Sequence, residues 1–102
     1  MDHACGDQLT TAGREQCFSN EGQMTDGKVA EALARLSRAS GAPGDVARSQ
    51  LLWTRYETSE CNLEAGAFEG GSEARVVGAA CRARLGQARL SELEAARQQY
   101  DH

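Results

Sequence analysis

Apolar residues recur every three or four positions in three segments of the chain, the spacing of one face of an α-helix. The first segment spans residues 27–40, the second runs from residue 45 to about 70, and the third from 72 toward the end. The positions that carry the pattern are Val29, Ala32, Leu33, Leu36, Leu51, Leu52, Trp53, Tyr56, Leu63, Val76, Val77, Ala80, Leu85, Leu93 and Ala96. No segment alternates like a strand. The pattern predicts an all-α fold with three main helices, the last two forming a long antiparallel hairpin.

Glycine and proline mark the joints between the predicted helices. Residues 41–44 read Gly-Ala-Pro-Gly, which is typical of a helix end, and Asp45 is the predicted N-cap of the second helix. Gly70 and Gly71 are expected to stop that helix, because a left-handed backbone favours glycine. Ser72 is the predicted N-cap of the third helix. The alternative role for Gly70, Gly71 and Ser72 is a flexible tip that enters the narrow cleft of a partner.

The first 25 residues have a weaker pattern, because glycines interrupt it. We expect a short helix from about Thr11 to Gln23, either separate from the helix at 27–40 or continuous with it. Residues 1–10 are expected to be extended. Since 102 residues suffice for one core but not for two, residues 1–102 are predicted to form a single domain.

The predicted core is small, because the chain has only one Trp, two Tyr and two Phe. Cross-links would add stability where burial alone is marginal. The chain has four cysteines without a C-x-x-C pair, which disfavours a zinc site or a thioredoxin-like redox site. Two disulfides, formed in an oxidising compartment, are the better interpretation.

The pairing of the four cysteines follows from the predicted hairpin. Cys61 lies ten residues before residue 71 and Cys81 lies ten residues after it, so a fold about this joint brings the two level with each other. A bond between them leaves Cys5 to pair with Cys17. Of the three possible connectivities this one is favoured, and the other two stay open.

Charge limits the classes of partner. Acidic residues outnumber basic ones, 15 to 11, and the formal net charge is −4, so a nucleic-acid partner is not expected and a cationic protein would be attracted. No stretch approaches the roughly 20 apolar residues of a membrane span. The first residues show neither the basic start nor the apolar run of a signal peptide. For an exported protein, we expect the targeting segment to lie outside this sequence.

The second and third segments carry an ordered set of motif residues. In chain order these are Gln50, Trp53, Tyr56, Glu60, Cys61, Gly70, Gly71, Ser72, Cys81, Leu85 and Arg89. This set resembles the LprI-type family of lysozyme inhibitors, formerly a domain of unknown function. In that family a Q-x-x-W segment precedes a cysteine, a glycine-rich joint and a C-x-x-x-L-x-x-x-R segment. Asp26, nine residues after Cys17, also fits the family pattern, and the resemblance runs from Cys5 to Leu93.

The chain departs from the family pattern at a few positions. Glu57 stands where the family usually has arginine, and Arg55 lies two residues earlier. Val29 and Ala30 replace a Leu-Asn pair, and Gly86 replaces a threonine. The resemblance implies an exported, often lipid-anchored domain of the bacterial envelope, with inhibition of lysozyme in some members. A role of the family arginine in partner binding would not carry over to Glu57.

Three carboxylates share a helical stripe with the only tryptophan: Trp53, Glu57, Glu60 and Glu64. One interpretation is a polar seam between the last two helices, with Glu60 paired to Arg82 and Arg89 lying against the indole of Trp53. The other is an acidic strip offered to a basic partner. Glu57 is expected at the edge of the hairpin without a basic partner, so a change to lysine there would weaken binding.

Catalysis is not expected. His3 and His102 lie at the chain ends, no internal histidine can act as a base, and G-x-S-x-G does not occur. No metal or cofactor is expected either. We predict a periplasmic or extracellular binding protein that inhibits a cationic lysozyme or related peptidoglycan hydrolase, in one version as an immunity protein. The alternative is a structural or interaction module of the envelope with no hydrolase target.

Overall fold

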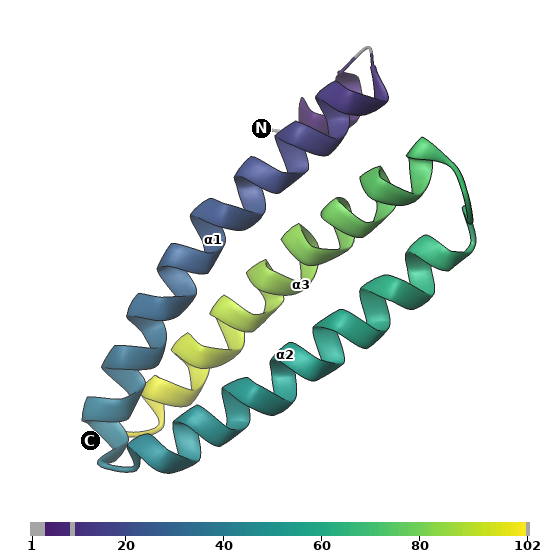
Figure 1. Ribbon diagram of the computed structural model, residues 1–102. Helices are drawn as coiled ribbons and strands as arrows, with labels where there is room; N and C mark the ends of the chain where they lie inside the picture. The colour runs from purple at the N-terminus through teal and green to yellow at the C-terminus, as the bar shows by residue number, and fades with distance from the viewer. Residues whose placement is uncertain (1–3, 9, 102) are drawn as a thin grey trace.

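The computed structural model describes residues 4–8 and 10–101, and they form three long helices (Figure 1). These are α1 (Thr11–Ser40), α2 (Pro43–Gly66) and α3 (Ser72–Gln98), preceded by the short 3-10 helix η1 (Ala4–Asp7). The described residues contain no strand. The predicted all-α fold is confirmed, whereas the extended segment expected over residues 1–10 is wrong for residues 4–7.

Helix α1 is continuous, so the short N-terminal helix and the helix expected at 27–40 are one element. Thr10 is its N-cap, and the side-chain oxygen of Thr10 accepts a hydrogen bond from the Gly13 N–H at 2.9 Å. It ends at Gly41, where φ is +66° and the N–H donates to the Ser37 carbonyl at 3.1 Å. A glycine inside a helix costs only about 0.5–1 kcal/mol relative to alanine, which packing against α3 offsets.

The two predicted N-caps are wrong. Helix α2 begins at Pro43 after Ala42, because the fixed φ of proline and its missing N–H suit the first helical position. Asp45 lies within the first turn, where its charge complements the helix dipole. Helix α3 follows Gly71 as N-cap, and Ser72 is its first residue and not its cap.

The chain runs along α1, back along α2 and forward again along α3, so α1 and α3 are parallel (Figure 1). Helices α2 and α3 form the predicted antiparallel hairpin, yet α3 packs more extensively against α1 than against α2. Small residues of α3 permit this close approach. A Cβ at Gly86 would lie 3.3 Å from the Thr25 Cγ2 of α1, and Ala79 and Ala83 are buried on the same helix.

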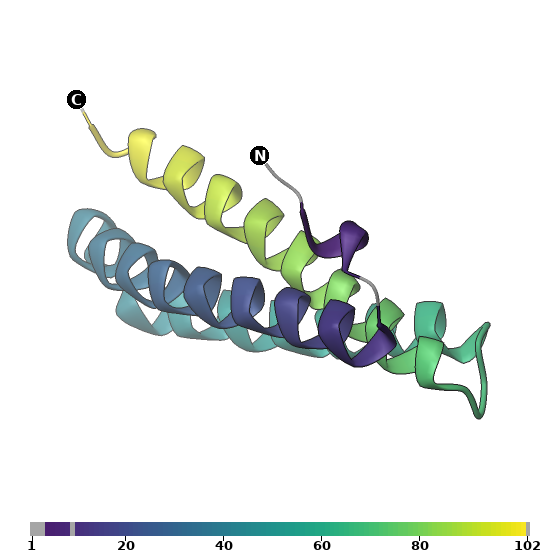
Figure 2. The same ribbon diagram turned by 90° about the horizontal axis from the view of Figure 1, so that it is seen from above.

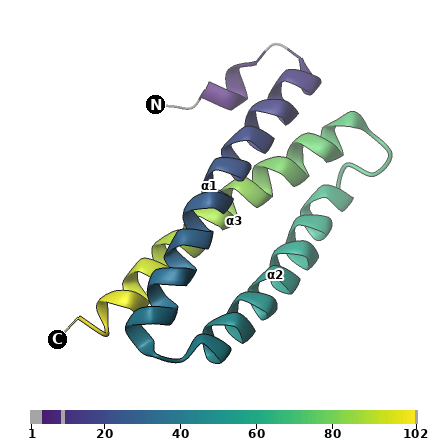
Figure 3. The same cartoon turned by 60° about the vertical axis from the view of Figure 1, so that its left-hand side comes forward.

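The apolar core occupies the end of the bundle where all three helices meet (Figure 3). Its buried members are Val29, Ala32, Leu36, Val46 and Leu93. Contacts between α1 and α2 are sparse, and α3 lies between them in Figure 1. The resulting shape is long and thin, 48 × 28 × 15 Å, with a radius of gyration of 15.5 Å against about 13 Å for a compact chain of this size.

Candidate functional site: the α2–α3 hairpin

Both predicted disulfides are present. Cys61 of α2 and Cys81 of α3 are buried and bonded, with their Cα atoms 5.5 Å apart. Cys5 and Cys17 are bonded with a Cα separation of 5.3 Å, which ties η1 to the first half of α1. The Cys61–Cys81 bond lies far from the apolar core, so it holds the hairpin together where burial contributes least.

A polar seam joins α2 and α3 between the Cys61–Cys81 disulfide and the apolar core. Arg89 is only 8% exposed, and its Nε donates to Gln50 Oε1 at 2.9 Å. Its Nη2 donates to Ser49 Oγ at 3.1 Å, and its Nη1 reaches the exposed Glu92 carboxylate at 3.4 Å. The guanidinium also lies 5.9 Å from the ring centroid of Trp53, which confirms the predicted contact with the indole. The seam therefore uses the Q-x-x-W residues and the last arginine of the sequence motif.

The predicted pair between Glu60 and Arg82 does not form. Arg84 instead donates to Glu64 at 2.7 Å, and this bond lowers the pKa of Glu64. A hydrogen bond with Glu64 raises the pKa of Glu60. A proton held on Glu60 makes this bond, whereas two ionised carboxylates would repel each other. Gly78 is the residue of α3 level with Glu64, and Arg84 lies more than one turn beyond it, so its long side chain reaches back along the hairpin.

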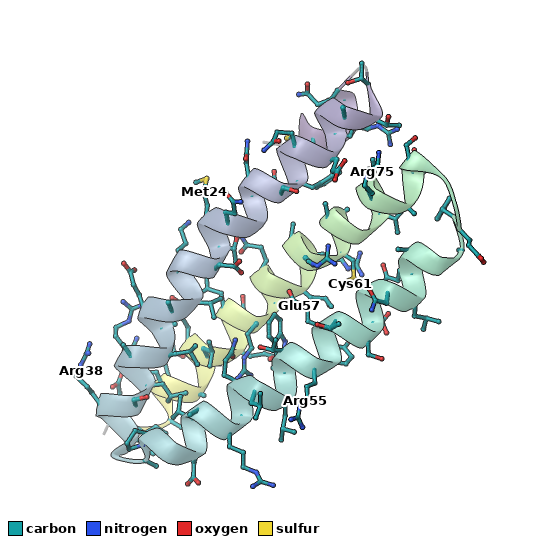
Figure 4. The ribbon with its side chains drawn as sticks, in the orientation of Figure 1. Met24, Arg38, Arg55, Glu57, Cys61 and Arg75 are labelled. Atoms are coloured by element: carbon teal, nitrogen blue, oxygen red, sulfur yellow. A yellow bond between two sulfur atoms is a disulfide. The ribbon has the colours of Figure 1, made fainter. Side chains whose placement is uncertain are left out.

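Glu57 lies in a different environment from the other two carboxylates. It is half-buried and points from α2 toward α3, whereas Arg55 points outward (Figure 4). Together with Asp26 of α1 and Arg82 of α3 it lines a groove of about 240 Å³. Burial raises the pKa of Glu57, the Asp26 carboxylate raises it further, and Arg82 lowers it. The expectation that Glu57 lacks a basic neighbour is therefore wrong.

The tip of the hairpin is a hydrogen-bonded turn. The Phe68 carbonyl accepts from the Gly71 N–H at 3.1 Å, and Gly70 between them has φ +78°, a left-handed conformation that favours glycine. Helix α2 itself ends at Gly66, so the helix stop expected near Gly70 and Gly71 comes about one turn earlier than predicted. All residues from Gly66 to Ser72 are exposed, including the side chain of Phe68. The sequence pattern did not single out Phe68. The feature that could have identified it is a lone aromatic residue close to a glycine pair.

Two ion pairs fasten the start of α3 to α1 beside the tip. Arg14 donates to both carboxylate oxygens of Glu73 at 2.9 Å, and these bonds lower the pKa of Glu73 and raise that of Arg14. Arg75 reaches Glu15 at 3.3 Å and is labelled near the tip in Figure 4. The hairpin is thus braced on α1 as well as by its own disulfide.

A family model described as lysozyme inhibitor LprI matches residues 2–93 of the chain. The chain belongs to this family. The match takes in both disulfides, the seam around Arg89 and the tip, and it leaves out only the last residues of α3, from position 94 onward. No curated protein and no solved structure matches the chain.

In this LprI-family chain, α2 leaves most of its large apolar residues exposed. It buries only Val46 and Cys61 among its residues. The exposed ones are Leu51, Leu52, Tyr56 and Leu63. Periodicity identified these positions as helical, but α1 contacts α2 only sparsely, so the outer face of α2 stays uncovered by the described residues.

The two histidines at the chain ends, His3 and His102, lie outside the described residues. The cluster of metal-ligating types found among the described residues joins Cys5, Cys17 and Glu21, and its two sulfurs are bonded to each other. None of the described helices is long and apolar enough to cross a membrane.

Proposed function

We propose that this chain inhibits a lysozyme or a related peptidoglycan hydrolase by docking the tip of its α2–α3 hairpin on the enzyme. The observation that carries the proposal is the match of a lysozyme-inhibitor family model to residues 2–93. Membership alone does not name the docking surface. The shape of the hairpin favours the tip as the docking surface. An enzyme that cleaves a polymeric glycan has a concave cleft, and the tip is convex and exposed.

Rigidity supports the same docking surface. The Cys61–Cys81 bond and the Arg14–Glu73 pair fix both helices behind the tip, so little conformational freedom is left to lose on binding. Gly70, Gly71 and Ser72 form the exposed backbone that would approach the enzyme most closely. In this proposal the tip acts as a preformed wedge, not as the flexible loop considered from the sequence.

Charge supports a cationic partner. The net charge is −4, and the half-exposed Glu60 and Glu64 lie on α2 behind the tip. Such rim charges chiefly raise the association rate, and added salt screens them. Glu57 contributes to this field from within its groove. We therefore expect inhibition to weaken as ionic strength rises, mostly through slower association.

Two disulfides fit a protein of the periplasm or the extracellular space. That is where a peptidoglycan hydrolase acts. A lipid anchor supplied by a segment outside this sequence would hold the inhibitor at the envelope. If its target is a toxin of the producing cell, the same activity makes it an immunity protein.

The test is a cell-wall lysis assay with a panel of lysozymes and peptidoglycan hydrolases, followed by turbidity at low and at physiological salt. The proposal predicts that lysis by at least one enzyme stops when the inhibitor reaches equimolar amounts. Reduced and alkylated protein is the matched control, since it keeps the composition and loses the brace. Undiminished lysis by every enzyme at tenfold excess would refute the proposal.

The exposed apolar face of α2 favours a second candidate, an interaction module of the envelope with no hydrolase target. Leu52, Tyr56 and Leu63 lie on this face, and clustered exposed apolar residues are typical of protein interaction surfaces. Substitution of these residues by serine should abolish an envelope interaction and leave the rate of cell-wall lysis by lysozyme unchanged. The same variants should inhibit normally if the hydrolase proposal is right.

A further inference from the structure

We infer that Phe68 is the anchor of the tip and occupies a sugar-binding position in the cleft of the target hydrolase. This inference rests on the proposed function and adds the residue and the chemistry of the contact. It starts from the position of an apolar ring at the extremity of the molecule. Phe68 is 45% exposed and is the only aromatic residue in the turn between α2 and α3.

The backbone holds Phe68 in a defined place. Its N–H donates to the Ala65 carbonyl at 3.0 Å, and its own carbonyl accepts from Gly71 at 3.1 Å. Both bonds fix the peptide groups on either side of the ring, and Gly70 supplies the left-handed residue that closes the turn. An anchor held in this way loses little entropy when it is buried in a partner, which is a property of residues that dominate interfaces.

The tip has the reach that insertion requires. From Cys61 to the end of α2 at Gly66 the helix advances by about 7.5 Å, at 1.5 Å per residue, and Phe68 follows in the turn, so the ring stands clear of the disulfide that braces it. Figure 2 shows the turn between α2 and α3 extending past the first turn of α1. The contacts of α1 in this region are with Glu73 and Arg75 of α3, which follow the turn, so the turn itself stays exposed to a partner.

The chemistry of the ring matches the site that it would enter. Glycan-binding clefts present aromatic and apolar surface to the flat C–H faces of sugar rings, together with a few polar groups. A phenyl ring is flat and of similar size, and it covers the apolar part of such a subsite without offering a bond to cleave. Glu69, exposed beside it, adds a negative charge that suits a cationic enzyme. Inhibition should therefore compete with a soluble oligosaccharide for the same cleft.

The experiment measures the inhibition constant of the full chain against a hydrolase that the wild type inhibits. Phe68→Ala should raise the constant by about tenfold or more, as for an anchor residue. Leu63→Ala is the matched control, because Leu63 is 72% exposed on α2 but lies outside the turn, and it should change the constant less than twofold. Circular dichroism should give equal melting temperatures for both variants.

Competition with a soluble chitin-type oligosaccharide provides the second readout. Raising its concentration should increase the apparent inhibition constant of the wild type in proportion. An unchanged constant for Phe68→Ala, or inhibition indifferent to the oligosaccharide, would overturn the role of Phe68 while leaving inhibition itself intact. If the wild type inhibits no hydrolase, the proposed function fails and this inference fails with it.

Discussion

Replacement of Arg89 by methionine tests whether the seam between α2 and α3 stabilises the fold. Arg89 is 8% exposed, and methionine would keep most of its buried stem while removing the guanidinium, which makes short hydrogen bonds to Gln50 and Ser49. At about 1–1.5 kcal/mol for each bond the loss is about 2–3 kcal/mol. The contact with Glu92 adds little, because it is long and that carboxylate is exposed.

Thermal and urea unfolding followed by circular dichroism would measure this loss. At about 4–8 °C per kcal/mol for a domain near this size, the melting temperature of Arg89→Met should fall by about 10–20 °C. Arg97→Met is the control, since Arg97 lies on the same helix and pairs with the exposed Asp101. It should change the free energy of unfolding by less than about 0.5 kcal/mol. Equal stabilities of the two variants would refute a stabilising role for the seam, as happens when a buried charge only offsets its own desolvation.

Three further predictions concern cross-links and pH. Replacing Cys61 and Cys81 by alanine should cost about 3 kcal/mol, and calorimetry should show a lower melting temperature with helix content unchanged in the cold. Because burial raises the pKa of Glu57, its ionisation destabilises the fold above the unfolded pKa of about 4.3, so Glu57→Gln should raise the melting temperature at pH 7 but not at pH 3. The lowered pKa of Glu73 has the opposite sign: Glu73→Gln should lower the melting temperature at pH 7, and the difference should shrink as the pH falls through that pKa. Differences independent of pH would contradict both assignments.

Much of the fold could be predicted from the chain because its signals are local. Helix formers at helical spacing predict the helices, and the glycine pair predicts the turn that makes Cys61 and Cys81 level. The continuity of α1 stayed open because glycine penalties are small and packing against α3 decides the outcome. The start of α2 was misplaced because Asp45 is a good cap in isolation, whereas Pro43 fits the first helical turn better.

The site was harder to predict, because it depends on rotation about the helix axes. Counting from the turn gives the level of a residue along the hairpin, so the contact between Trp53 and Arg89 was found. It does not give the direction in which a side chain leaves α3. For that reason the sequence predicted a pair between Glu60 and Arg82, whereas the structure pairs Glu64 with Arg84. Exposure of the outer face of α2 was also hidden, because periodicity cannot tell which neighbours a helix will have.

Hydrogen exchange of the chain, free and bound to an inhibited hydrolase, tests the central claim most directly. If the tip enters the enzyme, exchange should slow at the amides from Ala67 to Gly71 and in the first turn of α3, while the outer face of α2 stays unchanged. The residues of the turn are exposed in the free chain, and the N–H groups of Ala67, Phe68 and Gly71 already make its hydrogen bonds, so any protection added on binding reports the partner or a tightened turn. Phe68→Ala should reduce the protection. Protection confined to α1 or to the outer face of α2, with the tip unchanged, would contradict docking through the hairpin tip.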